Sequence, residues 1–66
     1  MLSENLKKIR KKKGLSQDKL AKLADVTLTT LVKLESGANS NPTIRILIRL
    51  ADVLNVKLDD LVERKT

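Results

Sequence analysis

The chain has 66 residues, a formal net charge of +6 and no cysteine, histidine or aromatic residue. A chain of this length makes one domain that buries only ~60% of its unfolded surface, so leucine, isoleucine and valine must fill an efficient core. The absence of cysteine and histidine excludes disulfides and the usual zinc ligands, and we expect no metal, no cofactor and a reducing cytoplasmic environment.

The first predicted helix spans residues 3–13 and stops at Gly14, a residue that suits the position after a helix end. Leu2, Leu6 and Ile9 have helical spacing and should face the core. Lysines cover much of the remaining surface of this helix. Lysines late in a helix suit its dipole, and they can equally form a patch that attracts polyanions.

A membrane role for this basic helix is a weaker alternative. Basic amphipathic helices can lie on anionic membranes, but the apolar face here is narrow and lacks tryptophan and phenylalanine. No uncharged apolar run approaches the ~20 residues that span a bilayer, and the charged N-terminus is unlike a signal peptide. We therefore expect no membrane partner.

The second predicted helix begins directly after Ser16. This serine is a good N-cap, because its hydroxyl can accept a hydrogen bond from a free amide of the first turn. Leu15 and Leu20 can pack together across that start as a hydrophobic staple. Leu20, Leu23 and Ala24 fall on one face of the helix.

The third predicted helix repeats these signals. Thr27 is its N-cap, Val26 and Leu31 form its staple, and a glycine ends it. Leu31 and Leu34 fall on one face. Because only a short turn separates this helix from the one before, residues 16–36 are predicted to form a helix-turn-helix.

The fourth predicted helix has Thr43 as its N-cap and continues to about Asn55. A short fifth helix follows, with Val56 and Leu61 as its staple pair. The buried stripe of the fourth helix is expected to contain Ile44, Leu47, Leu50, Ala51 and Leu54.

Nothing in the sequence indicates catalysis. Asp59 and Asp60 are the only adjacent acidic pair, and neighbours on a helix point about 100° apart, so they do not converge on one substrate. Both suit the first turn of the last helix, where the dipole favours negative charge. Gly14 and Gly37 are isolated, so no phosphate-binding glycine loop exists. We expect a binding protein and not an enzyme.

The chain resembles the Cro/repressor (Xre-type) family of helix-turn-helix DNA-binding domains. The likeness runs in order through almost the whole chain. The resemblance implies an all-α, compact five-helix lambda-repressor-like fold in a single domain, residues 1–66. The residues that carry it are Leu15-Ser16-Gln17, Leu20-Ala21, Ala24-Asp25-Val26-Thr27, Thr30-Leu31, Lys33-Leu34-Glu35, Gly37, Asn41-Pro42-Thr43-Ile44, Leu50-Ala51, Leu54-Asn55-Val56 and Leu58-Asp59-Asp60-Leu61.

In this family the second helix of the motif lies in the DNA major groove. The resemblance implies base contacts from the positions of Thr27, Leu28, Thr29 and Lys33. Lysine can donate to guanine O6 or N7, threonine can hydrogen-bond a base or place its methyl against thymine, and leucine makes apolar contacts only.

Two positions on this helix depart from the family. Leu28 stands where arginine or glutamine is frequent, and Val32 stands where a polar residue is frequent. Being four residues apart, they form a small apolar stripe on the expected reading face. One explanation is a methyl-rich, A·T-leaning DNA site; the other is that this helix contacts a protein.

Phosphate contacts are expected around the motif by resemblance. Gln17 should bond a phosphate, helped by the amides and dipole of its helix; the alternative is a solvated side chain. Asn and Ser in the loop after the third helix also favour turns for local reasons. The further residues predicted to contact phosphates are Thr30, Ser36, Asn39, Ser40, Asn41, Lys12 and Lys13.

Two other positions gain meaning from the resemblance. In such repressors, residues matching Arg10 and Glu35 form an ion pair that ties the first helix to the end of the third; the alternative is two unrelated surface charges. Lys57 stands where the family usually has a capping hydroxyl, so we expect the last helix to fray.

The predicted function is sequence-specific binding of double-stranded DNA in transcription regulation. One helix makes few base contacts, so we expect a homodimeric repressor on a palindromic operator, with half-sites ~34 Å apart. It would be cytoplasmic, and at the nucleoid when bound to DNA. The candidate dimer surface is Ile46, Ile48, Val53 and Val62, for which a broader core is the alternative. The alternative function is a protein-interaction module of the same fold, for example an antitoxin or regulatory partner, with weak or no base reading.

Overall fold

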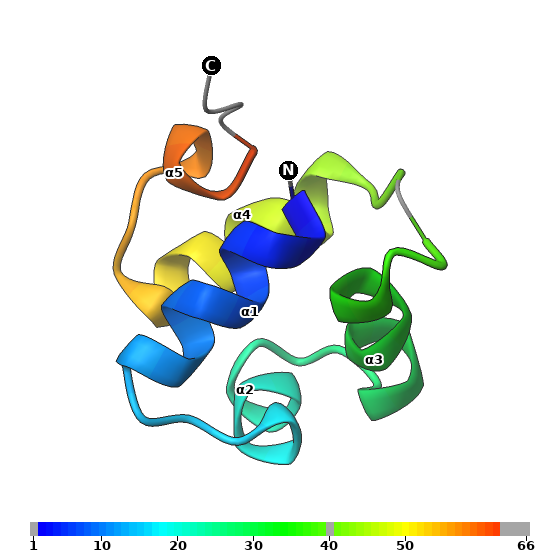
Figure 1. Ribbon diagram of the computed structural model, residues 1–66, viewed down its shortest axis with the longest axis horizontal. Helices are drawn as coiled ribbons and strands as arrows, with labels where there is room; N and C mark the ends of the chain where they lie inside the picture. The colour runs from blue at the N-terminus through cyan, green and yellow to red at the C-terminus, as the bar shows by residue number, and fades with distance from the viewer. Residues whose placement is uncertain (1, 40, 63–66) are drawn as a thin grey trace.

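Five α-helices make up the part of the chain that the computed structural model describes, residues 2–39 and 41–62 (Figure 1). No strand occurs in these residues, so the predicted all-α, five-helix architecture is confirmed. None of the described helices is long and apolar enough to cross a bilayer. The helices are α1 (Leu2–Lys12), α2 (Gln17–Leu23), α3 (Leu28–Ser36), α4 (Ile44–Leu54) and α5 (Leu58–Val62).

The predicted N-caps set the starts of α2, α3 and α4. In each case a side-chain hydroxyl accepts a hydrogen bond from the backbone amide three residues later, which satisfies one of the free amides of the first turn. Gly37 then ends α3 in the left-handed conformation, with φ at 85°. The three capping distances are 3.0 Å for Ser16, 3.1 Å for Thr27 and 3.2 Å for Thr43.

The start of α5 is held by a different contact from the one that is typical of the family. Lys57 offers no capping hydroxyl, but the carboxylate of Asp60 accepts from the Lys57 backbone N–H at 3.0 Å. This is the reaching-back half of a capping box. Leu61 then anchors the helix, because its side chain is fully buried.

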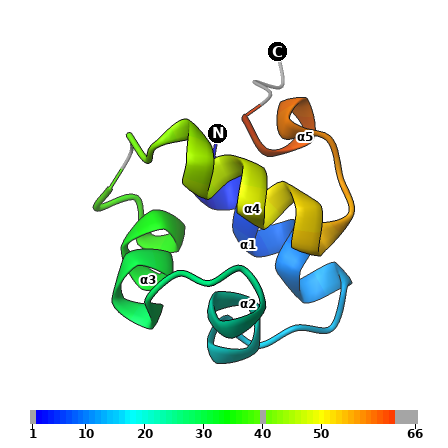
Figure 2. The ribbon, with the colours of Figure 1, turned by 180° about the vertical axis from the view of Figure 1, so that it is seen from behind.

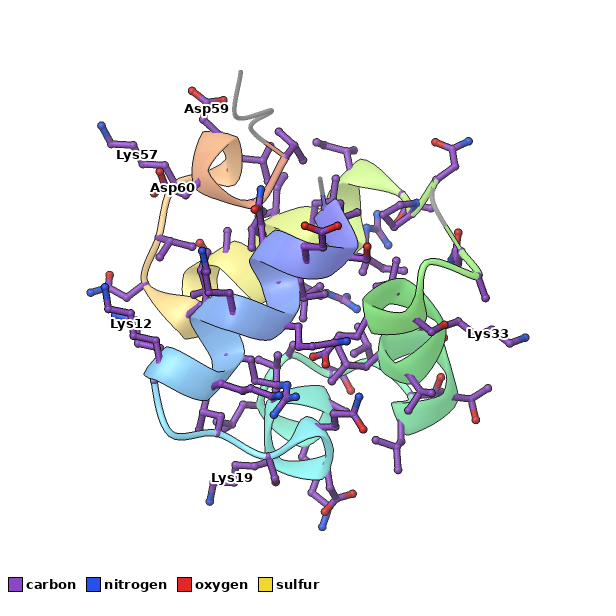
Figure 3. All side chains as sticks on the ribbon, in the orientation of Figure 1. Lys12, Lys19, Lys33, Lys57, Asp59 and Asp60 are labelled. Atoms are coloured by element: carbon purple, nitrogen blue, oxygen red, sulfur yellow. The ribbon has the colours of Figure 1, made fainter. Side chains whose placement is uncertain are left out.

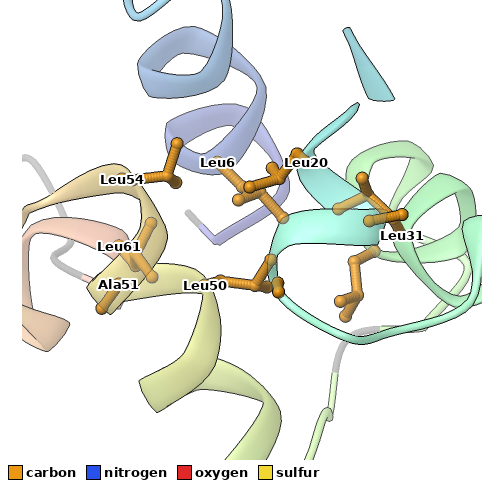
Figure 4. Packing of buried hydrophobic residues seen from close by; sticks show 10 residues of the cluster. Leu6, Leu20, Leu31, Leu50, Ala51, Leu54 and Leu61 are labelled. Carbon is orange, nitrogen blue, oxygen red and sulfur yellow. The ribbon is translucent and has the colours of Figure 1, made fainter. Parts of the chain in front are cut away.

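One leucine-rich core joins all five helices (Figure 4). α1 packs against α3 and α5, α2 packs against α3 and α4, and α4 packs against α5. In both ribbon views α2 and α3 lie together on one side of the molecule, and α5 lies at the opposite edge (Figures 1 and 2). The largest fully buried side chains are Leu6, Leu20, Leu31, Leu34, Leu50, Leu54 and Leu61.

Helical spacing misplaced two apolar residues. Ile44 was expected in the buried stripe of α4, and this prediction is wrong, since Ile44 is 60% exposed. Leu23, which shares the spacing of Leu20 on α2, is 54% exposed, and Ala21 is buried in its place. At about 100° per residue, Leu23 lies roughly 100° from the centre of the face formed by the buried residues of α2.

The four candidate dimer residues divide into two pairs. Ile46 and Val53 share one flank of α4 and pack against the core, which is the broader-core alternative. Ile48 lies on the other flank of α4 and is 47% exposed, and Val62 on α5 is 45% exposed. Ile48 and Val62 are therefore the more exposed of the four candidate dimer residues.

Candidate nucleic-acid interface

The third helix presents one face to the core and the opposite face to solvent. Leu31 and Leu34 are fully buried beneath it. On the outer face Leu28 is 43% exposed and Val32 is 41% exposed. Lys33 projects away from the body of the protein (Figure 3). Thr27 and Thr29 are also exposed, so the structure places all four predicted base-contacting residues at the surface.

The turn before α3 fixes the direction in which that helix leaves. Asp25 adopts a left-handed backbone conformation with φ at 56°, which aspartate tolerates better than most residues. The Val26 N–H donates to the Ala21 carbonyl at 3.0 Å and closes the end of α2. Arg49 of α4 donates to the Asp25 carbonyl at 3.4 Å, so the turn is held from both sides.

Two threonines at the start of α3 are hydrogen-bonded to each other through their hydroxyls. Thr27 Oγ1 accepts from the Thr30 backbone N–H at 3.1 Å and donates to Thr30 Oγ1 at 2.8 Å. The Thr27 hydroxyl therefore uses its donor and one acceptor position within the protein, whereas Thr30 keeps its own O–H donor. Within the described part of the chain, Thr29 and Lys33 are the α3 positions whose outward polar groups make no bond inside the protein.

A buried ion pair ties α1 to the end of α3. Arg10 Nε donates to Glu35 Oε2 at 2.6 Å, and Arg10 Nη2 donates to Glu35 Oε1 at 3.0 Å. Arg10 Nη1 also donates to the Leu15 carbonyl at 2.7 Å, which fastens the loop between α1 and α2. The two charged side chains are only 10% and 1% exposed, so the structure brings them together as a bidentate pair beneath the helix-turn-helix.

Gln17 extends this cluster toward the surface. Its Nε2 donates to Glu35 Oε1 at 3.1 Å. A side-chain amide carries two N–H donors, so the contact with Glu35 orients the group and leaves a second donor for an outside acceptor. Gln17 is half-buried at the first position of α2.

The loop after α3 is largely satisfied by its own hydrogen bonds. Ser36 Oγ donates to the Lys33 carbonyl at 3.1 Å and accepts from the Ala38 N–H at 3.3 Å. Asn39 Oδ1 accepts from the Asn41 N–H at 3.1 Å. These bonds match the local turn chemistry that was the alternative to phosphate contact. The predicted contact at Ser40 lies outside the described residues.

Lys12 and Lys13, which were predicted to contact phosphates, are exposed at the C-terminal end of α1. They line an open cavity of about 340 Å³ between α1 and α5. In Figure 3 the side chains of Lys12 and Lys33 project from opposite sides of the molecule. The other residues that line this cavity are Asn5, Lys8, Ile9, Val56 and Asp60.

Sequence reasoning passed over Arg45. This residue is exposed in the first turn of α4, directly after the loop that follows α3. The loop itself has no basic residue, and Arg45, two residues after Thr43, is the first basic residue that follows it. The sequence could have identified Arg45, because a residue in the first turn of α4 lies close to the loop that precedes that helix.

Comparison with known protein families gives a match over most of the chain. The helix-turn-helix family model matches residues 6–61. The transcriptional regulator SinR of Bacillus subtilis is 34% identical over 65 residues, which are 98% of this chain and 59% of SinR. The chain therefore spans about three fifths of the length of that relative.

Solved structures share the fold closely. A crystal structure of SinR in complex with DNA has a TM-score of 0.93 at 33% identity, and the match covers 96% of this chain and all of that one. A complex of the SinR and SinI proteins also gives 0.93 at 33% identity, covering 97% of this chain and 62% of that one. These neighbours confirm the predicted helix-turn-helix fold.

Proposed function

Since this chain belongs to the helix-turn-helix family of the Cro/repressor (Xre) type, we propose that it binds double-stranded DNA and regulates transcription. α3 would lie in the major groove, and α2 would cross the phosphate backbone. We propose that it acts in the cytoplasm. The protein would act by binding DNA and not by catalysis, as its relatives are named transcriptional regulators.

The outward face of α3 is the observation that carries the proposal. Its buried side is anchored by Leu31 and Leu34, and its N-terminus is capped by Thr27. The helix therefore remains rigid while Lys33 and Thr29 stand free to contact base edges. An α-helix of ordinary width fits the major groove of B-DNA, and a net charge of +6 supplies the attraction to phosphate.

Phosphate contact is assigned to residues that flank α3. Gln17 keeps one amide donor for a phosphate oxygen, and Glu35 fixes its direction. Asn41 and Arg45 follow on the other side of α3, at the loop and the start of α4. Lys12 and Lys13 are left out of this docking face because they line the cavity beside α5.

Selection of bound sites from random duplex DNA, followed by a salt titration, tests the proposal. The selected duplex should bind with a log-affinity that falls linearly with log salt, with a slope of about −0.9 for each phosphate neutralised. A palindromic selected site would support a dimer. Failure to bind any duplex at low ionic strength would refute the proposed function.

Two substitutions separate base contact from phosphate contact. Lys33→Ala should weaken the selected site by about 1–3 kcal/mol and relax preference at one base position. Gln17→Ala should weaken all duplexes alike. Lys57→Ala is the matched control, since it removes the same charge from the far side of the protein, as Figure 3 illustrates. Equal losses for Lys33→Ala and Lys57→Ala would contradict the docking assignment.

We further propose that the chain acts as a homodimeric repressor. Ile48 and Val62 are apolar and roughly half exposed, and Ile44 adds a third such residue on α4. The start of α4 and α5 both lie at the edge of the molecule furthest from α2 in Figure 1. A contact between two copies there would leave both α3 helices uncovered.

A protein partner is the second candidate function. Leu28 and Val32 give α3 an apolar stripe that could dock a protein, and SinR is known in complex with the SinI protein. This candidate predicts no steep dependence of duplex binding on salt. The same salt titration therefore distinguishes the two functions.

A further inference from the structure

The outward face of α3 is more apolar than a base-reading surface needs to be. Leu28 and Val32 are four residues apart, so they lie one above the other on the same side of the helix. Both are about two fifths exposed, while Leu31 and Leu34 on the inward face of the same helix are fully buried. Nothing in the core requires these two side chains, because they point away from it.

Hydrogen bonds within the protein further reduce the number of free polar groups on this face. The hydroxyls of Thr27 and Thr30 are bonded to each other. The Ser36 hydroxyl is turned back to the Lys33 carbonyl. Thr29, Lys33 and the O–H donor of Thr30 therefore supply the hydrogen-bonding groups that remain on this face, beside the two apolar side chains. A helix with so few free polar groups can read few base edges by hydrogen bonds.

The major groove offers one apolar group to such a face, the C5-methyl of thymine. From this match we propose that Leu28 and Val32 bind thymine C5-methyl groups and determine the sequence preference of the protein. The inference rests on the proposed DNA-binding function. Side chains at i and i+4 are ~5–6 Å apart, so the two contacts would fall about two base-pair steps apart at ~3.4 Å per step.

Lys33 suits this arrangement better than it suits a protein partner. It stands next to Val32 on the exposed part of α3 and has no ion-pair partner among the described residues. An ammonium group there is drawn to the negative potential of DNA. In this arrangement Lys33 donates to a base, and Leu28 and Val32 cover thymine methyl groups. Each of these exposed side chains would then contact the same major groove.

Replacement of single thymines by deoxyuridine in the selected duplex tests the inference. Deoxyuridine keeps every hydrogen-bonding group of thymidine and still pairs with adenine, and it lacks only the C5-methyl group. Each thymine under Leu28 or Val32 should lose about 4-fold in affinity when replaced, the worth of one buried methyl. Replacement in both halves of a palindrome should lose about 15-fold.

Variants then assign the methyls to the side chains. Leu28→Ala should bring the thymine-to-uracil affinity ratio close to one at one position, and Val32→Ala should do so at another. Leu23→Ala is the matched control, because Leu23 is an exposed leucine on α2, at 54% against 43% for Leu28, and it should leave every ratio unchanged. Circular dichroism of each variant verifies that the helices are intact.

The possible outcomes distinguish a failure of methyl recognition from a failure of DNA binding. If the duplex binds and every uracil substitution leaves affinity unchanged, methyl recognition is refuted while DNA binding stands. If ratios change but Leu28→Ala and Val32→Ala do not affect them, other residues contact the methyls and this assignment is overturned. If no duplex binds at all, the proposed function fails together with the inference.

Discussion

Replacement of Arg10 by methionine should destabilise the fold far more than the loss of a surface charge. Methionine is unbranched like the stem of arginine and has a similar helix propensity, but it lacks the guanidinium group. It removes both bonds to the Glu35 carboxylate and the bond to the Leu15 carbonyl. Glu35, whose side chain is only 1% exposed, is then left with Gln17 as its remaining partner.

The expected loss follows from burial. Removal of one partner of a buried ion pair costs about 3–5 kcal/mol, because the other charge stays uncompensated. At about 0.05–0.15 kcal/mol per residue, a domain of this size has roughly 3–10 kcal/mol in total. The melting temperature should therefore fall by at least about 12 °C, at ~4 °C or more per kcal/mol.

Thermal and urea unfolding followed by far-ultraviolet circular dichroism measures this loss, since the chain has no tryptophan or tyrosine for fluorescence. Arg10→Met combined with Glu35→Met should recover most of the stability, because an apolar pair replaces a buried charge. Lys22→Met breaks the exposed pair with Asp18 and should cost only about 0.3–0.5 kcal/mol. Equal effects of Arg10→Met and Lys22→Met would refute the structural role assigned to the buried pair.

Two further substitutions test the helix end and the dimer. Asp60→Ala removes the cap of the Lys57 N–H and should speed amide hydrogen exchange in α5. Asp59→Ala leaves that cap in place, and equal exchange in the two variants would contradict the capping role. Ile48→Asp should shift the protein toward monomer in sedimentation equilibrium, because it places a charge on the proposed apolar contact. Leu23→Asp is the matched control on α2, and unchanged association of both variants would exclude that surface.

Local signals in the sequence predicted where several helices begin and end, and the family resemblance predicted how the helices pack. Ser16, Thr27 and Thr43 mark helix starts because capping depends on a hydroxyl and the amides within one turn. Gly37 marks an end for an equally local reason, its left-handed backbone. Such features depend on neighbours in the chain, and the sequence carries them directly.

Long-range packing was harder to predict. Spacing placed Ile44 in the buried stripe of α4, but which flank of that helix is covered depends on its distant neighbours. The capping of α5 by Asp60 was missed because a carboxylate at the first turn had already been explained by the helix dipole.

The candidate site was predictable in its positions and less so in its chemistry. The resemblance placed Arg10 beside Glu35, where the structure has them. The hydrogen bonds from Gln17 to Glu35 and from Thr27 to Thr30 depend on side-chain geometry. The spacing of residues along the chain does not specify that geometry. Those bonds decide which polar groups are left for DNA.

Amide chemical shifts, recorded while the selected duplex is added to the protein, test the central claim most directly. The account predicts the largest changes along α3 from Leu28 to Lys33 and at Gln17, with little change along α5. Changes confined to α4 and α5, with those α3 amides unmoved by saturating duplex, would contradict it.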